Sequence, residues 1–291
     1  MKYRVTHRTD YTYDAEVGSS FGLAHVVPRE LAWQRTRGHV LTIDPVPGDS
    51  GRHRDAYGND AVYFHVTEPH ERLVIEAVTE VDVVPTVHDA AALAAPWELA
   101  RPLVHPELPG AWAATEFALA SPKVVPVPDA TAYAAASLTP GRPVREAVGE
   151  LMARIKTDFR YDSTATTVTS TVPDVLAARA GVCQDFAHLA IAGLRGHGVA
   201  ARYVSGYLAT QPPPGKERMV GADASHAWVA VWLPGTEEWL AFDPTNDMWV
   251  GDRHVTVAWG RDYGDVPPVK GVIFTEAKRS ILHVSVDVAP V

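Results

Sequence analysis

Cysteine is nearly absent from this chain of 291 residues, in which Cys183 is the only one. A single cysteine cannot form an internal disulfide, so nothing in the fold depends on an oxidising compartment. The sequence also lacks an apolar run near the roughly 20 residues needed to span a bilayer. Its first residues lack the apolar centre of a signal peptide. We therefore expect a cytoplasmic protein with no membrane partner.

Positive charge is also in short supply. The chain has 26 Lys and Arg residues against 35 Asp and Glu, a net charge of −9, and no basic run of the kind that follows a phosphate backbone. Nucleic acid is therefore not an expected partner. With 46% hydrophobic residues the chain has enough apolar material for one large or two modest domains.

Hydrophobic periodicity divides the chain into four parts and predicts an α+β protein. Residues 1–84 alternate between apolar and polar side chains and predict a β-rich N-terminal domain. Residues 85–140 are rich in proline and alanine and predict a connecting region of short helices. Residues 141–250 predict a core in which helices pack on an antiparallel sheet, and residues 251–291 predict C-terminal strands that complete the fold.

The most informative residue is Cys183, which lies where a loop is expected to enter a buried helix. Ala187 and Ala190 fall on the same helical face as Cys183, so the first turn presents the thiol at the edge of the core. The partial positive charge of a helix N-terminus favours the thiolate. A lone cysteine is often an inert packing residue, but a histidine and a carboxylate in later strands favour a nucleophile here.

Those partners are His226 and Asp243, which flank a predicted turn between two strands. If Leu233 faces Glu238 across an even-length turn, Asp243 faces Trp228 and becomes a diagonal neighbour of His226 on the same face of the sheet. An odd-length loop would place His226 and Asp243 on opposite faces. In that case another group, such as Asp223 or Asn246, would have to orient the histidine.

The predicted roles follow from nucleophilic acyl-transfer chemistry. Cys183 attacks, His226 forms the thiolate and later protonates the leaving amine, and Asp243 fixes the imidazole. The backbone N–H of Cys183 is one candidate oxyanion donor, and the second is not identified. Gln184 projects about 100° away from the thiol, which makes it a weak oxyanion donor but leaves it a candidate for substrate binding.

Several other residues have a structural or a functional reading. Trp228 is expected mainly in the core, although it is also a candidate wall of the substrate cleft, as is Tyr207. Asp185 and His188 lie on other helical faces than Cys183 and are expected to be local anchors. Zinc bound by the predicted triad is an alternative, but the closely spaced ligand pairs typical of such sites are missing. We therefore predict no metal and no cofactor.

The motifs around these residues resemble those of the bacterial transglutaminase-like superfamily, whose core has a papain-like arrangement. The family's cysteine, histidine and aspartate correspond to Cys183, His226 and Asp243. The matching core segments are Gly181–His188, Leu194–Tyr207, Ser225–Val229 and Trp239–Asn246. The N-terminal region preceding such cores is similar to Tyr11–Tyr13, Pro28–Arg29 and Asp55–Asn59, and the C-terminal segment to Ala258–Val266.

The resemblance implies attack on an amide carbonyl of a peptide or protein substrate through a thioester. Water as the acceptor makes the protein a cysteine protease or amidase, which we favour because water needs no acceptor site. An amine as the acceptor would make it a transglutaminase or a peptide cyclase. Paired acidic loops for calcium are not evident. The competing class is a non-catalytic peptide-binding scaffold, and the sequence leaves the oligomeric state open.

Overall fold

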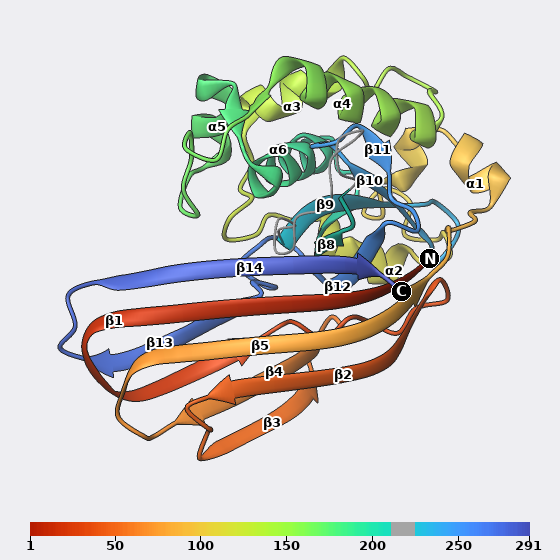
Figure 1. Ribbon diagram of the computed structural model, residues 1–291. Coiled ribbons are helices and arrows are strands. Elements are labelled where there is room, and N and C mark those ends of the chain that lie inside the picture. Colours follow the sequence, from red (N-terminus) through yellow and green to blue (C-terminus); the bar gives the residue numbers. More distant parts are fainter. Residues whose placement is uncertain (211–224) are drawn as a thin grey trace, which may run out of the picture.

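Two antiparallel β-sheets and a layer of helices make up the computed structural model, which describes residues 1–210 and 225–291 (Figure 1). A long, twisted sheet forms one side of the molecule. A smaller sheet lies against one end of it and packs on the helices, so the α+β architecture expected from the sequence is confirmed.

The long sheet is built around β1 (Lys2–Ala24), which pairs with four other strands. Its first half lies between β5 and β14, and its second half lies between β4 and β13. The strand order is β2-β5-β1-β4-β3, with β13 and β14 added on β1. The other strands are β2 (Gln34–Asp44), β3 (Asp49–Arg54), β4 (Asp60–Val66), β5 (His70–Val83), β13 (Val269–Thr275) and β14 (Ser280–Pro290).

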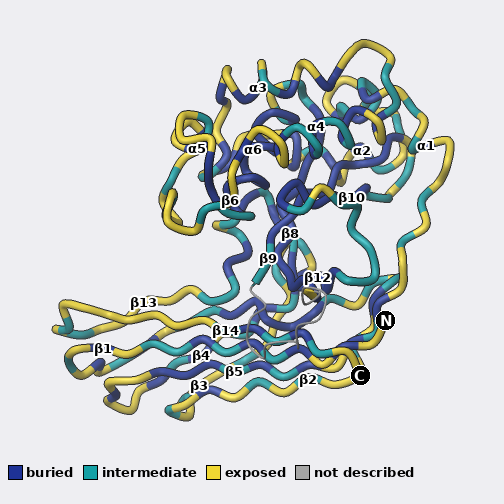
Figure 2. Tube along the Cα trace, turned by 45° about the horizontal axis from the view of Figure 1, so that its top comes forward, coloured by how far each residue is buried: buried dark blue, intermediate teal, exposed yellow. Residues whose placement is uncertain are grey.

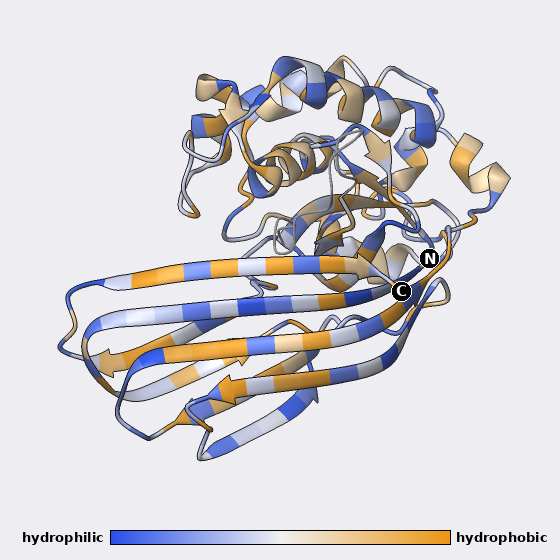
Figure 3. Ribbon diagram, viewed as in Figure 1, coloured by the Kyte–Doolittle hydropathy of each residue, from blue (hydrophilic) through white to orange (hydrophobic). Residues whose placement is uncertain are grey.

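Alternation of side chains explains why these segments form a half-exposed sheet. Hydrophilic and hydrophobic residues alternate along β1, β2, β5 and β14 (Figure 3). In the first half of β1, Tyr3, Val5, His7 and Thr9 are buried. Successive side chains of a strand point to opposite faces, so this period of two gives the sheet one covered face and one solvated face.

The smaller sheet has the order β11-β10-β9-β8-β12 and is buried almost throughout. Its strands are β8 (Ala201–Leu208), β9 (Ser225–Trp232), β10 (Trp239–Asp243), β11 (Met248–Trp249) and β12 (His254–Gly260). The short strands β6 (Arg160–Tyr161) and β7 (Ala180–Gly181) form a separate parallel pair. That pair places Tyr161 near the N-terminus of the helix that follows β7.

Helix α6 (Cys183–Gly196) lies against β8 and β9 and is the central helix of the protein. Every side chain from Gln184 to Leu194 is buried, so the helix is covered on all sides rather than on one face (Figure 2). The other α-helices are α1 (Ala90–Ala94), α2 (Ala111–Ala114), α3 (Pro128–Ala135), α4 (Val144–Asp158) and α5 (Val172–Ala178), with short 3₁₀ turns at Trp97–Ala100 and Thr115–Ala118.

The two sheets share a single apolar core where they meet. Tyr3 and Val5 of β1 and Val286 and Val288 of β14 belong to the same buried cluster as α4 and α6. The two chain ends lie next to each other at this junction, because β1 pairs with β14 from Tyr3 opposite Pro290 onward (Figure 1). One end of the long sheet is thereby fixed against the smaller sheet.

The structure refines the predicted organisation of the chain. The short helices expected within residues 85–140 are present; α1, α3 and the turn Trp97–Ala100 pack on the same core as α6, whereas α2 and the turn Thr115–Ala118 form a separate cluster with Trp232. The C-terminal strands are shared, since β12 joins the smaller sheet while β13 and β14 join the long one. The four-part division itself stays a prediction. Among the described residues, no helix combines the length and apolar character needed to cross a membrane.

Candidate active site

Cys183 is the first residue of α6, as the sequence predicts. The preceding turn is held by Asp185, whose Oδ2 accepts the backbone N–H of Val182 at 2.8 Å and the hydroxyl of Thr166 at 2.6 Å. Gly181 has to be glycine for this arrangement, because a Cβ there would lie 2.7 Å from the Asp185 carboxylate. The turn therefore fixes where the thiol emerges from the helix.

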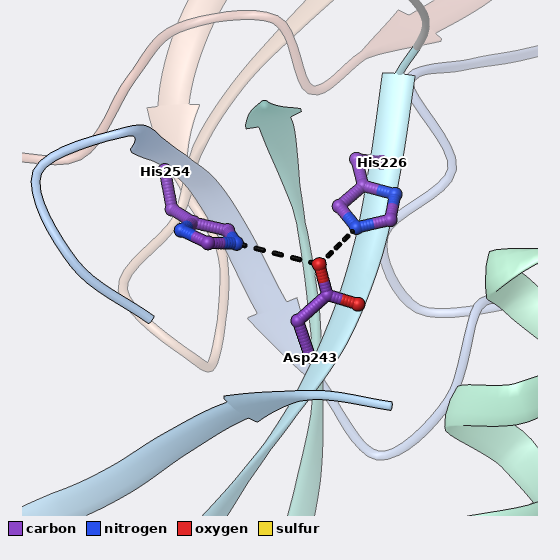
Figure 4. A group of neighbouring side chains, drawn as sticks. All are labelled: His226, Asp243 and His254. Carbon is purple, nitrogen blue, oxygen red and sulfur yellow. Dashed lines mark hydrogen bonds and ion pairs between the residues drawn. The ribbon is translucent and has the colours of Figure 1, made fainter. Parts of the chain in front are cut away.

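The hairpin of β9 and β10 has the register predicted from its even-length turn. Trp239 pairs with Trp232 and Phe242 with Val229, so Asp243 lies diagonally across from His226. Oδ2 of Asp243 accepts a hydrogen bond from Nε2 of His226 at 2.7 Å (Figure 4). The expected pairing of the imidazole with this carboxylate is present.

Asp243 is completely buried, and five donors surround its carboxylate. Oδ1 accepts the backbone N–H groups of Thr245 at 2.9 Å and Asn246 at 3.2 Å. Oδ2 accepts the Asn246 side chain at 2.7 Å in addition to His226, and Nε2 of His254 lies 3.4 Å away. Burial acts to raise the pKa of Asp243, but hydrogen bonds from His226, His254 and Asn246 outweigh it and hold that pKa well below its usual range.

The second ring nitrogen of His226 points away from Asp243 (Figure 4) and is left for the thiol. A carboxylate can only accept, so Nε2 carries the proton in that bond and Nδ1 is the nitrogen available to Cys183. Burial acts to lower the pKa of His226. Hydrogen bonds to Asp243 and Cys183 and their negative charges outweigh burial and raise that pKa to about 10. The raised pKa favours an imidazolium at His226 beside the thiol.

A cavity of about 310 Å³ opens beside Cys183 and His226 and is lined by both sheets. The core contributes Gln184, Tyr203 and Ser205, among others. The long sheet closes the other side with His7, Thr9 and Tyr11 of β1 and with Leu282 and Val284 of β14. No Asp, Glu, Lys or Arg is present among the described residues of its lining, so the wall opposite the thiol is uncharged and partly aromatic.

The three tentative substrate-binding residues take different positions. Gln184 lines the cavity beside Cys183. Tyr207 lies behind the wall, where its hydroxyl contacts Nδ1 of His7 at 2.9 Å. Trp228 is buried beside the imidazoles, with its ring edge-on to His254 at 5.2 Å. Neither Tyr207 nor Trp228 reaches the cavity surface.

The predicted anchors behave as structural groups. Asp185 holds the turn before α6, and Nε2 of His188 accepts the backbone N–H of Tyr263 at 3.1 Å. Asn246, one of the two fallback partners for His226, donates to Oδ2 of Asp243 at 2.7 Å, and its side-chain nitrogen also lies 3.4 Å from Nε2 of His226. The other fallback, Asp223, lies outside the described residues.

Two site residues were not found by sequence reasoning. His254 enters from β12, two strands away from β9 in the sheet, and burial keeps its pKa below the ordinary value. Tyr161 borders the cavity beside Cys183. Burial raises the pKa of the Tyr161 phenol, and the negative charge of Cys183 adds to this effect. Only the parallel pairing of β6 with β7 brings Tyr161 to the thiol, which no local pattern signals.

A metal ion has one plausible set of ligands in the described part of the chain, namely His226, Asp243 and His254, whose donor atoms lie within 4.8 Å of one another. This set differs from the zinc alternative considered for the sequence, because His254 takes the place of Cys183. The 2.7 Å separation of Nε2 and Oδ2 fits a shared proton. We interpret the group as a hydrogen-bonded cluster, and full turnover after dialysis against a chelator would test that interpretation.

Comparison with known proteins agrees with the fold. Residues 3–82 match the bacterial transglutaminase-like N-terminal region, and residues 131–244 match the transglutaminase-like superfamily. An uncharacterized protein of Mycobacterium tuberculosis is 51% identical across 99% of this chain and 93% of its own. An uncharacterized protein of Mycobacterium leprae is 31% identical across 93% of this chain and 92% of its own.

One solved structure has a similar fold. A candidate cysteine protease from Cytophaga hutchinsonii superimposes with a TM-score of 0.75 over 100% of this chain and 91% of its own. The two sequences are 20% identical, so the likeness concerns the fold.

Proposed function

The chain belongs to the transglutaminase-like superfamily, and we propose that it is a thiol-dependent enzyme that cleaves a peptide or isopeptide amide through Cys183, His226 and Asp243. One observation carries the proposal. The only cysteine lines the same cavity as an imidazole whose Nε2 is held at 2.7 Å by a buried carboxylate, and Cys183 contributes to raising the pKa of that imidazole. A scaffold that only binds peptides has no need for this arrangement.

The reaction follows from the positions of these groups. The Cys183 thiolate attacks the amide carbonyl carbon, a C–S bond forms, and the carbonyl electron pair moves onto oxygen. When the C–N bond breaks, Nδ1 of His226 gives its proton to the leaving amine. Water then attacks the thioester while Nδ1 takes a proton from it, and the thiolate leaves. Asp243 holds the ring through Nε2 during both halves and stabilises the imidazolium.

The start of α6 supports the developing oxyanion. Val182 occupies the N-cap position, and its side chain has no acceptor for the first amides of the helix. The backbone N–H of Cys183 is therefore free to donate to a carbonyl oxygen placed over the thiol. We propose this amide as one oxyanion donor.

Hydrolysis is the proposed outcome, and charge beside His226 supports it over transfer to a lysine amine. A second cavity of about 240 Å³ shares His226 and Tyr161 with the first and contains Lys156, Thr245 and Asn246. Lys156 donates to the carbonyl of Thr245 at 2.9 Å, which places an ammonium group near the position from which an acceptor would approach. A protonated amine is repelled there and water is not. The cytoplasm is the proposed compartment, which cell fractionation would test.

The only cysteine makes the decisive experiment unambiguous. Iodoacetamide at neutral pH is expected to alkylate the wild-type protein at Cys183 at least roughly tenfold faster than free cysteine, because the site favours the thiolate. Mass spectrometry after incubation with peptide libraries should reveal an acyl adduct on Cys183 in the wild type and none in Cys183→Ala. Alkylation no faster than free cysteine, together with full activity in Cys183→Ala, would leave the scaffold interpretation.

Adding amines to the same incubation tests the acceptor. Hydrolysed peptide should exceed the amine adduct when the added amine carries a positive charge. Predominant amine adducts would identify a transglutaminase or cyclase instead, while the thiol chemistry would stand.

A further inference from the structure

A separate cavity of about 330 Å³ lies at the other end of the smaller sheet. It is lined by three tryptophans from distant parts of the chain, Trp33, Trp239 and Trp259, together with Thr86, His88 and Arg202. Neither Cys183 nor His226 contributes to this wall. The cavity therefore needs its own explanation.

Arg202 is the charged group at the bottom of this cavity and is only 7% exposed. Its guanidinium lies 4.3 Å from the ring centre of Trp239 and 3.8 Å from that of Trp259. The guanidinium of Arg29 lies 3.5 Å from the ring centre of Trp259. Two cations cannot occupy the same face of one indole at these distances, so the four side chains form a stack in the order Trp239, Arg202, Trp259, Arg29.

The two arginines of this stack differ in their partners. Arg29 donates to the side chain of Asn59 and to the carbonyl of Tyr57 at 3.1 Å. The buried Nε of each arginine has no hydrogen-bond partner, but Arg202 also makes no other hydrogen bond among the described residues. Burial holds the pKa of Arg202 well below its usual range, the like charge of Arg29 adds to this, and no described carboxylate opposes the effect. Within the described part of the chain, Arg202 is therefore a buried cation without a compensating charge.

Such a cation is costly if packing is its only task. Removing a charge from water without pairing it is strongly unfavourable, and an apolar side chain of the same size could separate the two indoles without that cost. A guanidinium is suited to carboxylates because its N–H groups form a planar fork. Arg202 lines a cavity of about 330 Å³, which is large enough for a small molecule.

We propose that this cavity binds a carboxylate attached to an apolar body, with the carboxylate on Arg202 and the apolar body against the surrounding tryptophans. The charged residues at the opening of the cavity favour a ligand with a single negative charge. Glu237 and Glu238 line the opening, and Glu238 is within 2.9 Å of Nδ1 of His88. A doubly charged phosphate would be repelled by these two acids and matched by only one cation.

The site is independent of the proposed amide cleavage, although one residue lies between them. Trp228 lines a smaller, separate pocket that also contains Arg202, and it packs against His254. A ligand on Arg202 and a peptide on Cys183 would occupy different cavities. Binding can therefore be measured in Cys183→Ala, where failure of the amide chemistry has no influence on the result.

Isothermal titration of Cys183→Ala with three probes tests the proposal. Phenylacetate, a free acid, and N-acetylphenylalanine, which has the carboxylate of a peptide end, are expected to bind saturably. Phenylacetamide should bind roughly tenfold or more weakly, because it lacks the charge-assisted hydrogen bonds to the guanidinium. Tighter binding of N-acetylphenylalanine than of phenylacetate would identify a peptide C-terminus as the source of the carboxylate, and the reverse order a free acid.

Three variants in the same background locate the site. Arg202→Met should reduce phenylacetate affinity at least roughly tenfold. Thr86→Phe should do the same by filling the cavity while leaving Arg202 in its stack, which keeps the test decisive if Arg202→Met fails to fold. Arg145→Met is the matched control, because Arg145 lies over Trp249 at 5.3 Å and away from this cavity.

Two results would overturn the proposal. One is the absence of saturable binding of every probe up to its solubility limit. The other is phenylacetate binding that survives both Arg202→Met and Thr86→Phe.

Discussion

Two buried charges share one face of the smaller sheet, and they are treated in opposite ways. Cross-strand pairing places Gly206 opposite His226 and Arg202 opposite Ala230, so Arg202 lies on the same face as the His226–Asp243 pair. Asp243 is surrounded by five donors, whereas Arg202 has aromatic faces and no acceptor among the residues that the structure describes. The fixed donors around Asp243 allow this carboxylate to orient the reacting imidazole. The guanidinium of Arg202 is suited to binding an anionic group from a ligand.

Trp228 lies between the two ends of this face, one with the His226–Asp243 pair and the other with Arg202. Its ring passes over Gly206, where a Cβ would lie 2.4 Å from the indole, so glycine at this strand position lets the ring lie flat over the sheet. The indole packs against the imidazole of His226 on one side and lines a small pocket that contains Arg202 on the other. This aromatic side chain therefore lies between the two buried charges.

The largest expected difference between the two ends is in turnover of a peptide amide. His226→Ala should lower turnover by several orders of magnitude, because no other group can accept and return the proton at the thiol. Arg202→Met should leave turnover within a few-fold of wild type. The measurement is the single-turnover rate of acyl-enzyme formation. Comparable losses in both variants would show that the two ends act as one site.

Asp243→Asn should produce the next largest loss. An asparagine keeps the size of the side chain and its contacts, but its amide can present an N–H to Nε2 and select the wrong imidazole tautomer. A loss of turnover on the order of 10⁴ is expected, with substrate binding preserved. The effects of His226→Ala and Asp243→Asn should not add, since the two residues act as a unit.

Turnover within a few-fold of wild type in Asp243→Asn would show that Asn246 or His254 can hold the ring without the carboxylate. Their side chains already lie 2.7 Å and 3.4 Å from Oδ2 of Asp243.

The pH profile tests the same pair more finely. The acid limb of the rate should report formation of the thiolate–imidazolium pair, and the alkaline limb loss of the His226 proton. Asp243 and Cys183 raise the pKa of His226 to about 10, so the alkaline limb should fall well above the ordinary histidine range near 6.5. Asp243→Asn removes a contribution that raises this pKa, and the limb should move to lower pH.

Arg202→Met is the control for this profile and should leave both limbs unchanged. A rate that rises steadily to high pH in the wild type would mean that His226 and Cys183 are not coupled.

Local sequence patterns predict almost completely the end of the smaller sheet that holds His226 and Asp243. A helix that starts at Cys183 and a hairpin with an even-length turn are properties of short segments, and both were predictable. The even turn alone decides that His226 and Asp243 share a face. The side chains that complete the site come from farther away. His254 depends on the pairing of β12 with β8, which has an irregularity after Thr256.

The wall opposite the thiol and the Arg202 cavity depend on contacts between segments that lie far apart in the sequence. His7 and Thr9 reach the thiol only because the first half of β1 docks on the core, more than 170 residues away in sequence. Arg202 is an ordinary charged residue in a strand-like run until Trp239 and Trp259 enclose it. Periodicity cannot predict an unpaired buried charge, because burial of that side chain depends on tryptophans that follow it by 37 and 57 positions.

Arg202→Met is expected to have the smallest effect on activity. Its effect on the free energy of unfolding should contrast clearly with that of His226→Met. Replacing Arg202 by methionine removes an uncompensated charge and keeps an unbranched chain between the two indoles. The lost cation–π contacts oppose the gain, so the free energy of unfolding should stay the same or rise by about 1–3 kcal/mol. His226→Met, on the same face, leaves the Asp243 charge buried without its partner and should lower that free energy by about 3–5 kcal/mol. Urea unfolding of the two variants at pH 7, without added carboxylates, measures both. If Arg202→Met were as destabilising as His226→Met, the charge of Arg202 would have to be compensated within the folded protein, and the two ends of the sheet would not differ in the way described.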